Sequence, residues 1–166
     1  MARTASVIVD QSVKAGDTSD HTAFAYSRAG RQDEDFERCV LMPKYQKQQF
    51  QQVCKNELDS MKLYRVKLFA AGVYCLTYAE LQRLKDVIID VEYENQGARI
   101  KGFLYNWWMD YGGFDRGELP DVRFELIRNY DPVRCHDLAN EVRKHPSRAD
   151  EETSKDFVFN LLLPSS

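Results

Sequence analysis

The sequence predicts an α/β fold in which a mixed β-sheet is flanked by helices. Two β-branched runs, residues 5–10 and 86–93, have the composition of buried strands. Residues 100–111 carry apolar side chains at intervals of three and four, which is the spacing of an amphipathic helix. A chain of 166 residues has the length of one domain, so we expect a single domain over residues 1–166.

The amino-terminal part predicts three consecutive strands. The run at 5–10 is followed by a polar turn and by further strand-like segments at 22–27 and 36–42. Because the connections are short, these strands are expected to pair as an antiparallel meander.

The middle of the chain predicts two helices and two strands. Apolar residues recur at helical spacing over 44–61, and residues 64–70 resemble a strand. The pattern from Thr77 to Glu80 is a capping box, which predicts a short helix to about Lys85. The strand at 86–93 follows.

The segment 100–111 is the strongest helix prediction. Asn95 is a suitable cap before it, and Gly112–Gly113 is a suitable end. Trp107 and Trp108 follow the apolar spacing of this helix. An aromatic pair could stack on bases or anchor an interface, but at this spacing it favours the core.

The carboxyl-terminal part predicts a strand and two helices. Residues 121–128 alternate like a strand, and Pro132 suits the first position of a helix that continues to about Lys144. A last helix is expected to begin at Ser147 and to end before Pro164.

Composition limits the class of protein. No apolar run reaches the roughly 18 residues of a membrane span, and the first residues lack the features of a secretory signal. We therefore expect an intracellular protein of the cytoplasm, the nucleus or a viral factory, with no membrane contact. No glycine-rich phosphate loop is present, so no nucleotide cofactor is expected.

The four cysteines are scattered and form no CxxC pair, which predicts buried free thiols. The three histidines, His21, His136 and His145, do not fall at zinc-ligand spacing with any cysteine. His136 and His145 are candidates for general bases, but neither has a partner at a suitable spacing, which favours a solvated or hydrogen-bonded role.

Four acidic residues are candidate metal ligands. Asp10 and Glu94 end predicted strands, and Glu152 and Asp156 lie four apart on the predicted last helix. Gathered carboxylates repel one another unless a cation is present, and Mg²⁺ prefers oxygen ligands. For each acid taken alone, a turn or a solvated surface position is the simpler interpretation, because the chain has 26 acidic residues.

Three segments resemble a known family. The stretches that begin at Ser6, Tyr93 and Glu152 are similar to the first strand, the Glu-containing strand end and the last helix of Holliday junction resolvases. These are enzymes of poxviruses and other large DNA viruses, related to bacterial RuvC. The order of predicted elements is also that of the ribonuclease-H-like fold.

This resemblance implies a metal-dependent endonuclease that cuts branched DNA as a homodimer. Asp10, Glu94, Glu152 and Asp156 would then be the catalytic ligands of Mg²⁺ or Mn²⁺, and Lys101 would face a DNA phosphate.

A basic cluster precedes the predicted acidic helix. Arg143, Lys144 and Arg148 could clamp a nucleic-acid phosphate, or could be the basic residues expected at a helix end. The net charge of −3 counts against DNA binding, which depends on phosphate neutralisation. Two alternatives therefore stay open: a non-enzymatic structural or interaction protein, such as a viral one, and a nucleic-acid-binding module on the same fold.

Overall fold

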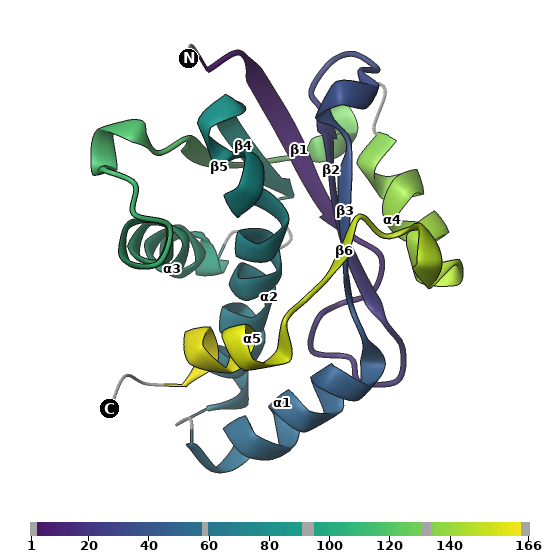
Figure 1. The fold of residues 1–166 in the computed structure, drawn as a ribbon, viewed down its shortest axis with the longest axis vertical. Coiled ribbons are helices and arrows are strands. Elements are labelled where there is room, and N and C mark those ends of the chain that lie inside the picture. The colour runs from purple at the N-terminus through teal and green to yellow at the C-terminus, as the bar shows by residue number, and fades with distance from the viewer. Residues whose placement is uncertain (1–2, 58–59, 91–94, 131–133, 164–166) are drawn as a thin grey trace.

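The structure, a computed structural model, describes residues 3–57, 60–90, 95–130 and 134–163 (Figure 1). It contains a six-stranded mixed sheet with the order β5-β4-β1-β2-β3-β6. The strands are β1 (Ala5–Gln11), β2 (Thr22–Arg28), β3 (Arg38–Met42), β4 (Leu84–Asp90), β5 (Asp121–Glu125) and β6 (Glu151–Glu152). The predicted meander is confirmed, since β1, β2 and β3 pair antiparallel. On the other side of β1, strands β4 and β5 run parallel to it.

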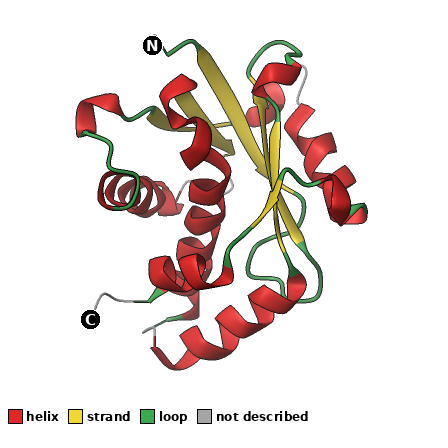
Figure 2. Ribbon diagram, viewed as in Figure 1, coloured by secondary structure: helices red, strands yellow, loops and turns green. Residues whose placement is uncertain are grey.

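Helices cover both faces of the sheet (Figure 2). They are α1 (Lys44–Glu57), α2 (Met61–Thr77), α3 (Gly97–Asp110), α4 (Arg134–Lys144) and α5 (Lys155–Leu162). Helices α2 and α3 pack on one face, and α5 lies against α1 and α2. Helix α4 packs on the opposite face, over β1, β2 and β3. The predicted fold class, a mixed sheet flanked by helices, is therefore confirmed.

The alternation of side chains along the central strands divides the core into two layers. In β1, Val7 and Val9 belong to the layer under α2 and α3, whereas Ile8 belongs to the layer under α4. In β4, Ile89 and Ile88 divide in the same way. A side chain two positions after Ile8 or Ile88 therefore lies on the α4 face.

The predicted strand at 64–70 is wrong, because these residues lie inside α2. Helix α2 is buried between the sheet, α3 and α5, so it is apolar on nearly all sides. A helix buried in this way lacks the periodicity that distinguishes it from a buried strand. The Ser60 hydroxyl caps its start by accepting a hydrogen bond from the Leu63 backbone N–H at 3.0 Å.

Several predicted boundaries also differ from those of the structure. Residues 78–83 form a 3₁₀-helix, because the Thr77 hydroxyl donates back to the Val73 carbonyl instead of capping a new helix. Helix α3 begins at Gly97, and the preceding Gln96 makes no side-chain cap. β5 ends at Glu125 and is followed by a 3₁₀ turn.

The last helix begins later than predicted. The backbone N–H of Cys39 donates to the Asp150 carboxylate at 2.7 Å, and that of Thr153 donates to the Leu41 carbonyl at 2.9 Å. These bonds hold residues 151–152 against β3 as the short strand β6. Helix α5 then begins at Lys155.

Two predictions about the core are confirmed. Trp108 is fully buried and Trp107 is 7% exposed, both within the layer under α2 and α3. All four cysteines are buried thiols. Within the described ranges, no helix combines the length and the apolar character needed to cross a bilayer.

Candidate active site

Asp10 and Asp90 lie side by side at the carboxyl ends of two neighbouring parallel strands. The last registered pair of β1 and β4 is Val9 with Ile89, and each aspartate is the next residue of its strand. Both follow the alternation that directs Ile8 and Ile88 toward α4. The two carboxylates therefore lie together on the α4 face of the sheet, at the carboxyl ends of β1 and β4.

Helix α4 adds an imidazole to this pair. His136 lies in its first turn, and its Nδ1 atom is 2.8 Å from Asp10 Oδ2. The other carboxylate oxygen of Asp10 accepts a hydrogen bond of 2.8 Å from the backbone N–H of Gln11. The Asp10 side chain is 13% exposed, whereas that of His136 is 60% exposed. The carboxylate is therefore fixed on both oxygens, and the imidazole stands at the solvent side.

Asn140 lies one turn along α4 from His136. Its Nδ2 donates to the His136 carbonyl oxygen at 3.2 Å and lies 3.3 Å from His136 Nε2. With a hydrogen on Nδ1, the imidazole donates a hydrogen bond to Asp10. The arrangement orients the carboxylate of Asp10 through the imidazole ring.

The environment raises the pKa of Asp10 above its ordinary value. Burial is the main cause, because it disfavours the charged carboxylate. The hydrogen bonds from His136 and from the Gln11 backbone oppose this effect, and the negative charge of Asp90 adds to it. A divalent cation between the two carboxylates would remove the repulsion that this pair carries.

A shallow cavity of about 310 Å³ opens over these groups. Its lining residues are Asp10, Asp90, Ile127, Arg128 and His136. Arg128 is exposed in the 3₁₀ turn after β5, so its guanidinium is free to approach a phosphate or carboxylate of a bound molecule. Among the described residues, no group of three or more His, Cys, Asp or Glu side chains is close enough to hold a metal ion. The described lining thus provides two carboxylates, one imidazole and one guanidinium.

Among the acidic residues predicted from the sequence, the three that the structure describes, Asp10, Glu152 and Asp156, are not brought together. Glu94 lies outside the described residues. Glu152 is in β6, at the far edge of the sheet, with β2 and β3 between it and β1. Asp156 is in α5, on the opposite face of the sheet from α4. The predicted shared helix face of Glu152 and Asp156 is lost because β6 interrupts the helix.

The predicted phosphate-binding residues are also divided between the two faces. Lys101 is on α3, where its Nζ lies 3.5 Å from Asp121 Oδ1. Arg143 pairs with Asp20 at 2.8 Å, and Arg148 pairs with Glu141. Lys144, at the end of α4, is exposed.

Sequence reasoning missed Asp90 and Arg128 and did not assign His136 a partner. The predicted strand ran to residue 93 and drew attention to Glu94, whereas β4 is described as far as Asp90 and residues 91–94 lie outside the described part of the chain. A signal for Asp90 was present in the run from Asp86 to Asp90. Its two acids are four positions apart and therefore lie on the same face of the strand, as Ser6 and Asp10 do in β1. The contact between His136 and Asp10 joins residues 126 positions apart and has no local signal.

No protein-family model, curated protein or solved structure matches this chain.

Proposed function

We propose that this protein is a divalent-metal-dependent nuclease whose metal-binding carboxylates are Asp10 and Asp90. The observation that carries the proposal is their position, side by side at the ends of β1 and β4 in a cavity with His136 and Arg128. Mg²⁺ is commonly held by only one or two carboxylates together with water and substrate phosphate. Two carboxylates facing an open cavity fit that requirement.

Each residue has a distinct part in this proposal. The bound cation would lower the pKa of a water molecule and stabilise charge on the phosphate. Asp10 is held in one orientation by His136 and by the Gln11 backbone N–H, which prepares one oxygen position toward the cavity. Arg128, at the rim, would contact a phosphate of the substrate.

We propose branched DNA as the substrate and a homodimer as the active form, on the resemblance to the resolvase family. The observed order of three strands, helices, a strand, a helix, a strand and a helix supports a ribonuclease-H-like fold. So does an aspartate at the end of the first strand, facing the helix that follows β5. The metal ligands of this proposal are Asp10 and Asp90. Glu152 and Asp156, which the sequence suggested, are not among them.

The test is cleavage of a four-way DNA junction and of a linear duplex in the presence of Mg²⁺ or Mn²⁺. We expect Asp10→Asn and Asp90→Asn each to reduce the cleavage rate roughly 100-fold or more, and to weaken Mn²⁺ binding in calorimetry. Asp156→Asn is the matched control, because it removes an acidic residue on the opposite face of the sheet. Equal loss of activity in Asp156→Asn would contradict this site.

A second candidate is a nucleic-acid-binding module without catalysis. The absence of a group of three metal ligands within the described part of the chain favours it. In that case the protein would shift a branched DNA in a gel without divalent metal, with strong salt dependence, and would cut nothing.

A further inference from the structure

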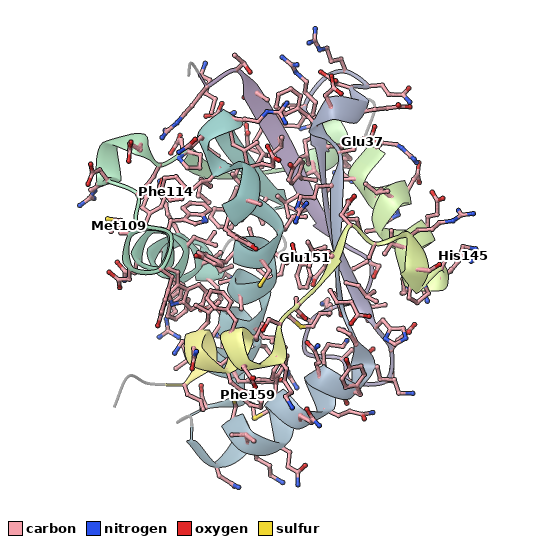
Figure 3. All side chains as sticks on the ribbon, viewed as in Figure 1. Glu37, Met109, Phe114, His145, Glu151 and Phe159 are labelled. Atoms are coloured by element: carbon pink, nitrogen blue, oxygen red, sulfur yellow. The ribbon has the colours of Figure 1, made fainter. Side chains whose placement is uncertain are left out.

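A second cavity lies on the opposite side of the sheet from Asp10. It has a volume of about 460 Å³ and lies among the end of α2, the segment after α3, β6 and the start of α5. Figure 3 labels two of the residues that contribute to it, Phe114 after α3 and Glu151 in β6. The proposed nuclease site at Asp10 and Asp90 does not include this cavity.

Aromatic rings form much of its wall. The rings of Tyr74 and Tyr78 are stacked, with centroids 5.8 Å apart and planes inclined by 7°. Phe157 lies 5.5 Å from Tyr74 on another side, and Tyr111 meets Phe157 edge-on at 5.9 Å. Tyr74 is 2% exposed, whereas Tyr78 and Tyr111 are 40% and 47% exposed. The cluster therefore has a buried centre and two rings open to solvent.

The charged groups of this cavity are acidic. Glu151 and Glu152 line it, and no Lys, Arg or His is among its described lining residues. The Glu151 carboxylate lies 2.6 Å from Arg38, which is not among the described lining residues. After burial, the charge of Glu151 is the next cause that raises the pKa of both Cys75 and Tyr78. The charge of Arg38 acts on the pKa of Tyr78 in the opposite direction but comes later in the order of causes, so the stronger of the two charges at Tyr78 is that of Glu151.

This combination selects one ligand chemistry. The faces of aromatic rings carry negative electrostatic potential, and they attract a cation that is weakly hydrated. An anion would face two carboxylates, and the basic residue nearest to them, Arg38, lies outside the described lining and is already paired with Glu151. A neutral apolar molecule would gain contact with the rings but nothing from the carboxylates.

We propose that this cavity binds a small organic cation of the quaternary or methylated ammonium class, with Tyr78 and Tyr111 against its methyl groups and Glu151 as the counter-charge. The proposal is independent of the nuclease activity, because the described linings of this cavity and of the Asp10 site have no residue in common.

The test compares choline with 3,3-dimethylbutan-1-ol, in which a carbon replaces the charged nitrogen. Binding to the whole protein is followed by calorimetry and by the ring proton resonances of the tyrosines. We expect choline to bind at least roughly tenfold more tightly than the neutral analogue, the difference that desolvated cation–π contacts provide. Equal affinity of the two would overturn the proposal, and so would no binding of choline at millimolar concentrations.

Substitutions in the cavity test whether choline binds there. Tyr111→Leu and Glu151→Gln should each weaken choline binding several-fold, whereas Tyr111→Phe should preserve it because the ring remains. Tyr45→Leu is the matched control, since Tyr45 is a 55% exposed tyrosine on α1 outside the cavity. Choline binding that is unchanged in Tyr111→Leu and Glu151→Gln would place the ligand elsewhere and refute the assignment.

Discussion

The imidazole of His136 is held 2.8 Å from the carboxylate of Asp10, although 126 positions separate the two residues in the sequence. This contact ties α4 to the end of the central strand β1. The pKa of Asp10 is subject to two opposing effects: burial raises it, and the hydrogen bond from His136 lowers it.

The first prediction is that His136→Ala raises the pKa of Asp10 further. The substitution removes a hydrogen bond that favours the charged carboxylate and leaves Asp10 beside Asp90. The measurement is a carboxyl ¹³C NMR titration of protein labelled at aspartate. His145→Ala is the control, because His145 is exposed beyond the end of α4. A pKa of Asp10 that stays the same in His136→Ala would mean that the contact is not formed in solution.

The second prediction concerns stability and pH, in the absence of divalent metal. Because the folded pKa of Asp10 is raised above 3.8, the folded protein retains this proton to a higher pH than the unfolded chain. The free energy of unfolding therefore falls as pH rises from about 4 through the folded pKa. Asp10→Asn removes this loss, so the variant should be more stable than the wild type at pH 7, and this advantage should disappear in acid.

Urea denaturation across this pH range measures the difference. Asp137→Asn, an exposed acid on the same helix as His136, should show no such gain. If the Asp10→Asn variant is less stable than the wild type at neutral pH, the hydrogen bonds of the carboxylate stabilise the folded protein more than the burial of its charge destabilises it.

The parts of the fold that could be predicted are those specified by local patterns. The meander follows from short polar turns, and α3 follows from the spacing of its apolar residues. Helix α2 could not be recognised, because burial on nearly all sides removes its periodicity. Helix α3 was recognised because one of its faces meets water, whereas the buried strands of the meander were recognised from the turns between them.

In the candidate site, too, the residue with a local sequence signal was predicted and those that depend on tertiary contacts were not. Asp10 was predicted because it lies at the end of a clear strand. Asp90 required the register of β4 against β1, and the role of His136 required a contact between distant segments. Glu152 was placed on a helix because the pairing of β6 with β3 is a tertiary interaction that its own sequence does not indicate.

The third prediction uses two glycines in neighbouring helices. A Cβ atom at Gly72 of α2 would overlap the ring of Phe24, a fully buried residue of β2. Gly72→Ala should therefore destabilise the protein by about 1–3 kcal/mol, as overpacking does. Gly102 of α3 is exposed and has nothing within 4 Å of such an atom, so Gly102→Ala should stabilise by up to about 1 kcal/mol. Thermal or urea unfolding of the two variants gives both values, and equal effects would contradict the close packing of α2 on β2.

The last prediction concerns Lys47, whose side chain is buried in α1. Its Nζ donates to the Asp17 carbonyl and, at 2.8 Å, to the Thr22 hydroxyl. Burial lowers its pKa from 10.5 to about 8, because the charged ammonium is disfavoured away from water. Between these two values the folded protein has lost the proton and the unfolded chain still holds it. The free energy of unfolding should therefore rise with pH from about 8 to about 10.5.

Lys47→Met isolates this effect, because the other groups that titrate in this range are present in both proteins. The stability of the wild type relative to Lys47→Met should increase across the range by on the order of 3 kcal/mol. Lys55→Met is the matched control, since Lys55 is an exposed lysine on the same helix, and its difference from the wild type should stay constant with pH. If the Lys47→Met difference is equally constant, the ammonium is solvated in the folded protein, and the anchoring of residues 17–22 to α1 does not depend on a buried charge.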